Sequence, residues 1–158
     1  MSALQEKKLK ELLVRYDKKI FGFALQLSRG NRDKAYDVAA SAFAETAQSP
    51  ASDGKAFLAL LHAVMKKSST ADLAPVSDED DFKDLKPAER NNLLYIRRAI
   101  QSLSFGAQAA VLLRDQLNLS YREMAVIFHT SEDEIKNRTL RARKEIRTRL
   151  QETLRDAR

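Results

Sequence analysis

The sequence predicts an all-α protein made of two small helical bundles joined by a flexible acidic linker. Apolar residues recur at steps of three and four along most of the 158 positions, which is the period of an amphipathic helix. Only four Gly and three Pro interrupt this pattern, and we find no convincing alternating strand pattern. With 44% hydrophobic and 32% charged residues, the composition is that of a folded, helix-rich domain and not of a disordered chain.

The first bundle is assigned to residues 1–70. Apolar spacing predicts three helices in it, over about 4–27, 33–47 and 56–67. Gly30 and Asn31 follow the first helix and are typical residues for its end. The third helix is apolar around most of its circumference, so we expect it at the centre of the bundle.

A linker is predicted where the helical pattern fails, between residues 68 and 89. This stretch gathers serines, acids and the prolines Pro75 and Pro87, and 78–84 holds five acids beside one Lys. Such composition is typical of a flexible connection with a domain boundary inside it. We assign the linker to residues 71–90.

The second bundle, residues 91–158, is expected to contain a helix-turn-helix. Its predicted helices cover about 91–103, 106–117, 120–128 and 132–154. Two capping boxes stand in tandem, because Ser120 precedes Glu123 and Ser131 precedes Glu134 by three residues. Two helix starts eleven residues apart, with a short connection at His129 and Thr130, define the motif. We expect its shared interior to consist of apolar side chains, namely Met124, Ala125, Ile127, Ile135, Ala142 and Ile146.

The last predicted helix is strongly basic. Between Lys136 and Arg149 there are seven basic residues and one acid, in a chain whose formal net charge is +6. Ala142 is expected on the buried side of this helix. Most of the lysine and arginine side chains should therefore project outward, as in a helix that enters the DNA major groove. A solvated basic face on an ordinary bundle helix is the other interpretation. The acids at 132–134 favour the helix dipole but would face phosphates or base edges, so we expect binding in isolation to be weak.

The segments 103–115, 119–125 and 135–144 together resemble region 4 of extracytoplasmic-function (ECF) sigma factors. The family usually has a Gly where this chain has His129. The resemblance implies that the C-terminal helix-turn-helix recognises the −35 promoter element. The residues we expect to contact this element are Ser120, Tyr121, Glu132, Lys136, Asn137, Arg138, Arg141, Arg143 and Lys144.

The N-terminal half resembles region 2 of the same family in a degenerate form. The similarity rests on Tyr16, Phe43 and the segments 23–25, 35–38, 57–61 and 64–67. It implies binding to the clamp of RNA polymerase, through Asp37, Phe43 and Glu45, and contact with the −10 element, through Phe57, Lys66 and Lys67. The family's Gln-Glu pair is replaced by Ala40 and Ser41, its Trp by Leu60, and its Asn by Lys67. The alternative for these residues is a core helix that ends in solvated lysines and a solvated acidic face.

Three functions compete on this evidence. The first is a sigma factor that directs core RNA polymerase to specific promoters, with promoter DNA, the polymerase and an anti-sigma factor as partners. The second is a sigma mimic that sequesters an anti-sigma factor, which the replaced Gln-Glu pair and the acids at 132–134 favour. The third is a stand-alone helix-turn-helix regulator that uses the first bundle for dimerisation.

Other classes of function are excluded by what the sequence lacks. There is no Cys, and His62 and His129 stand far apart, so we expect neither a disulfide nor a metal site. Without a glycine-rich phosphate loop or a plausible nucleophile, we expect no enzyme, no cofactor and no small-molecule substrate. No apolar run is long enough to span a bilayer, and the charged N-terminus lacks the apolar stretch of a signal peptide. We therefore expect a cytoplasmic protein without membrane insertion.

Overall fold

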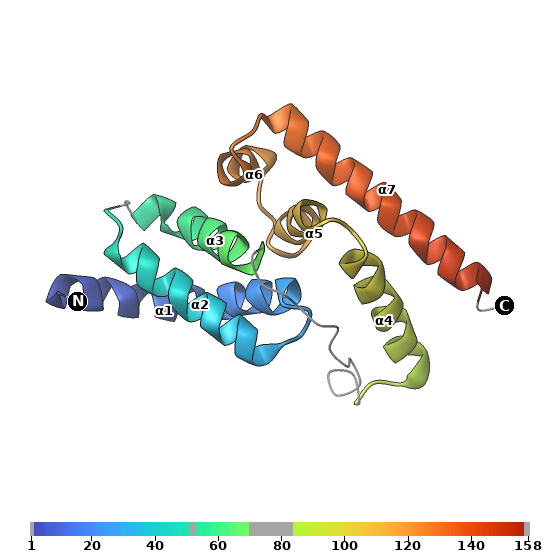
Figure 1. Ribbon diagram of the computed structural model, residues 1–158, viewed down its shortest axis with the longest axis horizontal. Coiled ribbons are helices and arrows are strands. Elements are labelled where there is room, and N and C mark those ends of the chain that lie inside the picture. The colour runs from blue at the N-terminus through green and yellow to red at the C-terminus, as the bar shows by residue number, and fades with distance from the viewer. Residues whose placement is uncertain (1, 51–52, 70–83, 157–158) are drawn as a thin grey trace. The chain divides into compact units, whose positions relative to one another are not determined.

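The computed structural model describes residues 2–50, 53–69 and 84–156, and every regular element within these residues is a helix (Figure 1). The all-α prediction is thereby confirmed. The elements are α1 (Ala3–Leu27), α2 (Arg32–Gln48), α3 (Asp53–Ser69), α4 (Pro87–Gln101), α5 (Phe105–Val111), the π-helical turn η1 (Leu112–Gln116), α6 (Tyr121–Phe128) and α7 (Glu132–Asp156). Most of the predicted acidic linker lies outside the described residues.

The chain divides into two compact units. The first contains α1, α2 and α3, which pack on one another as a bundle. Leu60, Leu61 and Val64 of α3 are all fully buried, which confirms α3 as the central element. Leu60 is thus a core residue. The alanines of α2 carry almost no side chain, so α2 can approach α1 closely.

The ends of α1 and α2 follow their local sequence. Ser2 and Gln5 form a capping box at the start of α1. At the other end, Gly30 adopts a φ of 82°, which belongs to the left-handed region that glycine enters without steric cost. Asn31 then caps α2 by accepting a hydrogen bond from the Lys34 N–H at 3.1 Å. The predicted stop after residue 27 is confirmed.

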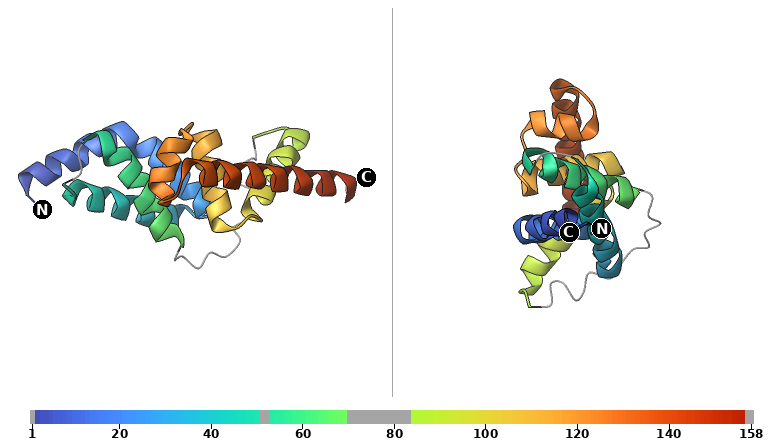
Figure 2. Two further views of the ribbon diagram at one scale, coloured as in Figure 1. Left: turned by 90° about the horizontal axis from the view of Figure 1, so that it is seen from above. Right: turned by 90° about the vertical axis from the view of Figure 1, so that its left-hand side faces the viewer.

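The second unit is built on α4, α5, η1, the whole of α7 and the first residues of α6. Its core includes a cluster of Leu103, Val111 and Ala142, against which Ala107 and Ile146 pack. Both α4 and α5 contact α7. The last turns of α7 project past the other helices of this unit (Figures 1 and 2).

Two predicted helix boundaries of the second unit were wrong. The helix expected to start at Asn91 begins at Pro87, because the fixed φ of proline suits the first helical position and its missing N–H is not needed there. The helix expected over 106–117 is α-helical only to Val111 and continues as η1. In η1 the Leu117 N–H donates to the Leu112 carbonyl at 3.1 Å, which is the wider spacing of a π-turn.

None of the helices in the described part of the chain is long and apolar enough to cross a membrane.

Candidate DNA-binding surface

The first helix of the motif, α6, starts at a complete capping box. The Glu123 N–H donates to Ser120 Oγ at 3.1 Å, and the Ser120 N–H donates to Glu123 Oε1 at 3.0 Å. Two backbone donors at the helix start are satisfied in this way. Ser120, predicted as a DNA contact, thus uses its hydroxyl oxygen within the protein while its side chain stays exposed.

The second capping box is formed in part. The Glu134 N–H donates to Ser131 Oγ at 3.1 Å. The Glu134 carboxylate is directed along α7, where its Oε1 lies 3.7 Å from Arg138 Nη2 and 3.8 Å from Arg141 Nη2. An acid at the start of α7 therefore neutralises part of the charge of two bases that were predicted to contact DNA.

The turn between α6 and α7 has an unusual backbone. His129, which stands where the family usually has Gly, adopts a φ of 52°. This left-handed conformation disfavours residues with a Cβ by roughly 1–2 kcal/mol. The chain therefore keeps the turn geometry of the motif without its usual glycine.

The buried side chains of α6 and α7 agree with the predicted interior of the motif, and those of α7 form one stripe along the helix. The predicted interior residues Met124, Ala125, Ile127, Ile135 and Ala142 are all buried, and Ile146 packs partly buried against the core cluster. Thr139 also belongs to this stripe and is fully buried. Its Oγ1 donates to the Ile135 carbonyl at 2.8 Å, so the hydroxyl is satisfied inside the apolar stripe.

The opposite side of α7 is exposed and mainly basic. We call it the outward face and define it by the residues Asp133, Lys136, Asn137, Leu140, Arg141 and Lys144, all of which are exposed. The Arg141 side chain retains 73% of its accessible surface. Glu132 is exposed at the start of the helix. The predicted contacts Lys136, Asn137, Arg141 and Lys144 thus share one surface.

Arg143, also predicted as a DNA contact, has a protein partner. Its Nε donates to Asp115 Oδ2 at 3.2 Å, and its Nη2 donates to Asp115 Oδ1. The hydrogen bond with Asp115 raises the pKa of the Arg143 guanidinium, and Tyr121 adds to this rise. Arg143 therefore connects α7 to η1 instead of projecting freely from the outward face.

Tyr121 is held in the same network. The guanidinium of Arg114 lies 4.4 Å from the centroid of the Tyr121 ring, and Arg114 Nη1 donates to the Leu119 carbonyl at 2.7 Å. The sequence indicated neither Arg114 nor Asp115 as a functional residue. The only available signal was their position directly before the motif.

In the first unit, the predicted −10 residues have different environments. Phe57 is half-buried, and its ring stacks on Tyr16 with centroids 4.8 Å apart and planes at 19°. Lys19 Nζ lies 5.8 Å from the Phe57 centroid. Lys66 is exposed, whereas Lys67 Nζ pairs with Glu45 Oε2 at 2.9 Å.

The three predicted polymerase contacts also differ. Asp37 is exposed. The hydrogen bond from Lys67 lowers the pKa of the Glu45 carboxyl, so this carboxylate is partly neutralised within the protein. Phe43 is only 3% exposed. Its assignment to the polymerase interface is corrected, because its ring belongs to the core of the bundle.

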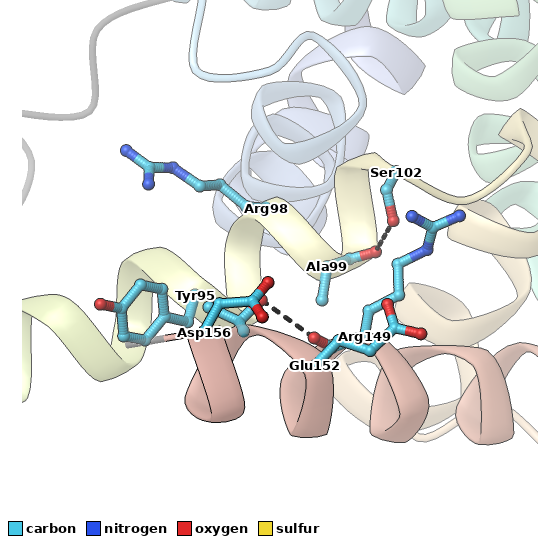
Figure 3. A pocket seen from close by; sticks show the side chains of 8 residues that line it. Tyr95, Arg98, Ala99, Ser102, Arg149, Glu152 and Asp156 are labelled. Atoms are coloured by element: carbon cyan, nitrogen blue, oxygen red, sulfur yellow. Dashed lines mark hydrogen bonds between the residues drawn. The ribbon is translucent and has the colours of Figure 1, made fainter. Parts of the chain in front are cut away.

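One depression on the second unit lies between α4 and α7 (Figure 3). It is lined by Tyr95, Arg98, Ala99, Ser102, Arg149, Glu152, Thr153 and Asp156. Its two arginines are matched by two carboxylates, so it offers no net charge to a polyanion. Nowhere in the described residues do three or more His, Asp or Glu side chains gather as a metal site would require.

Residues 93–146 match the family model for sigma-70, region 4. The match covers about a third of the chain and contains α6 and residues 132–146 of α7, which include the outward face. No curated protein shows a significant match to the chain. This segment of the chain is therefore similar to region 4 of sigma-70 and has its helix-turn-helix.

Proposed function

We propose that this chain is a sigma factor of the ECF type, which joins core RNA polymerase and directs it to specific promoters. The observation that carries the proposal is the outward face of α7. Four exposed polar residues, Lys136, Asn137, Arg141 and Lys144, are presented by a motif that matches region 4. A helix with such a face can lie in the major groove of the −35 element. Its lysine and arginine side chains then contact phosphates, and selected side chains contact the edges of the nucleobases.

Electrostatics limit how strongly this face binds DNA by itself. Lysine and arginine contacts to phosphates release counterions and supply much of the affinity. Glu134 lies close to Arg138 and Arg141 and weakens their attraction for phosphates. Promoter binding therefore depends on the polymerase, which holds the region 4 domain near DNA and raises its effective concentration.

The first unit supplies the polymerase contact and the −10 contact in this proposal. Asp37 is the exposed carboxylate available to a basic clamp surface. The stacked rings of Tyr16 and Phe57, with Lys19 beside them, offer the combination of aromatic surface and positive charge that single-stranded DNA prefers. A factor with this function acts in the cytoplasm, where polymerase and chromosome are found.

A sigma mimic that sequesters an anti-sigma factor is the second candidate. The internal ion pairs favour it. Glu134 pairs with Arg138 and Glu45 pairs with Lys67, so both basic side chains are less available to DNA phosphates. The exposed bases of the outward face argue against it, since a mimic needs no DNA-facing surface.

The test combines polymerase binding with transcription. Purified core polymerase is incubated with the chain or with the Lys136→Ala/Arg138→Ala/Arg141→Ala variant, and initiation is mapped on a genomic promoter library. Both proteins should bind the polymerase, and only the unmodified chain should support initiation from a restricted set of promoters.

A variant with the same loss of charge elsewhere is the control. Lys7, Lys10 and Lys18 are exposed on α1, and their replacement by Ala should leave promoter choice unchanged. If the unmodified chain fails to bind core polymerase at micromolar concentration, the sigma proposal is rejected and the mimic becomes the better account.

A further inference from the structure

An exposed leucine lies within the basic outward face of α7. Leu140 is 46% exposed. Its neighbours one turn away on the same face are Lys136 and Lys144, because residues four apart are adjacent on a helix surface. The side chains of the unit's core on this helix, Ile135 and Ala142, point the opposite way and are buried. Leu140 is therefore outside the core of the unit.

The surroundings of Leu140 do not fit a protein interface. Its nearest neighbours on the face are Lys136, Asn137, Arg141 and Lys144, all exposed and hydrophilic. The centres of protein interfaces are depleted of lysine and need a larger apolar patch. A ligand that matches this face must be anionic around its edges and must offer one small apolar group at a defined point.

The major groove of DNA has this combination. Phosphates line its rim, and on its floor the C5-methyl group of thymine is the apolar feature that side chains can contact. The rise of 1.5 Å per residue separates Asn137 and Leu140 by about 4.5 Å along α7. Base pairs follow one another every 3.4 Å or so. These two side chains can therefore lie over neighbouring base pairs.

We propose that Leu140 is a specificity residue that recognises thymine through its methyl group. This inference rests on the proposed function, because it requires α7 to enter the major groove of a promoter element. It adds that one position of this element is distinguished by an apolar contact, whereas the basic residues around Leu140 bind irrespective of sequence.

The test is a double-mutant cycle between protein and DNA. The holoenzyme formed with the full chain selects its upstream element from a random duplex library, and each thymine of that element is then replaced in turn by deoxyuridine, which lacks only the methyl group. At one position the replacement should weaken binding about three- to fivefold, the amount expected for one buried methyl group. With Leu140→Ala, thymine and uracil at that position should bind equally, whereas Leu140→Met should still prefer thymine.

Leu154 provides a matched control, since it is 53% exposed on the same helix but lies about 21 Å further along its axis. Leu154→Ala should keep the preference for thymine. The inference is overturned if Leu140→Ala discriminates thymine from uracil as the unmodified chain does, or if the unmodified chain is indifferent to uracil at every position. If the holoenzyme selects no upstream element at all, the proposed function itself fails. Equal thermal unfolding curves for Leu140→Ala and the unmodified chain will show that folding is intact.

Discussion

Disrupting the pair of Asp115 and Arg143 should loosen α7 from η1 and destabilise the C-terminal unit. The two residues are 28 positions apart, and the carboxylate accepts two hydrogen bonds from the guanidinium. Bidentate geometry places the pair at the strong end of its class. The side chains are 35% and 44% exposed, however, so solvent screens their attraction.

The magnitude follows from this exposure. Exposed ion pairs contribute about 0.2–1 kcal/mol, and we expect a coupling energy near the upper limit, about 0.5–1 kcal/mol. For a unit of this size, 1 kcal/mol corresponds to a shift of roughly 4–8 °C in Tm. The Tm of either single variant should thus be a few degrees lower than that of the unmodified chain.

The assay is a double-mutant cycle with Asp115→Asn, Arg143→Gln and the double variant, followed by thermal unfolding. Single variants should be destabilised and the double variant should lose little more than either one. The coupling should shrink in 1 M salt, where charges are screened within about 3 Å. Additive effects, or a coupling that is unchanged by salt, would refute the assignment of this pair as an electrostatic connection between η1 and α7.

Three further predictions concern single side chains. His129→Gly should raise the free energy of unfolding by up to about 1 kcal/mol, because the relief of the left-handed backbone outweighs the greater freedom of glycine in the unfolded chain; chemical denaturation that gives an equal or lower value contradicts this. Ile135→Ala should cost about 2–5 kcal/mol, since Ile135 is fully buried, and a loss below 1 kcal/mol would show that it is not a core residue. The pKa of Glu45 is lowered in the folded state by its hydrogen bond with Lys67, so its stabilisation is present above the unfolded pKa and is lost as the pH falls through the folded value. The unmodified chain should therefore be more stable than Glu45→Gln at neutral pH by a few tenths of a kcal/mol, because the Glu45 side chain is 56% exposed and solvent screens the pair. In acid this difference in the free energy of unfolding should vanish. A difference that persists at pH 2 would contradict the prediction.

Periodicity predicted the interior of the helix-turn-helix because that interior depends on local spacing. Ile135 and Ala142 are seven residues apart, which is two turns, and both are buried as expected. Ser120 and Glu123 were predicted as a capping box from their spacing, and both hydrogen bonds of the box are present. Such features require only the geometry of one helix.

Features that depend on tertiary contacts were not predictable in the same way. The contact of Arg143 with Asp115 joins two elements far apart in sequence, so a basic residue on a basic helix could not be recognised as a structural one. Phe43 was assigned to the polymerase by family resemblance. It lies one helical turn after Ala39, however, and both residues are on the buried side of α2. The period of the helix was the better guide there, because it reports burial directly.

The measurement that tests the central claim most directly is a site-specific crosslink. A photoreactive side chain replaces Asp133 on the outward face, and the holoenzyme is irradiated on a promoter that it transcribes. We predict crosslinks to duplex DNA at a single upstream element, and none from the same group placed at Gln151, which is exposed about 27 Å further along α7. Crosslinks from position 133 to protein subunits alone, on a promoter that is being transcribed, would contradict the placement of this face in the DNA groove.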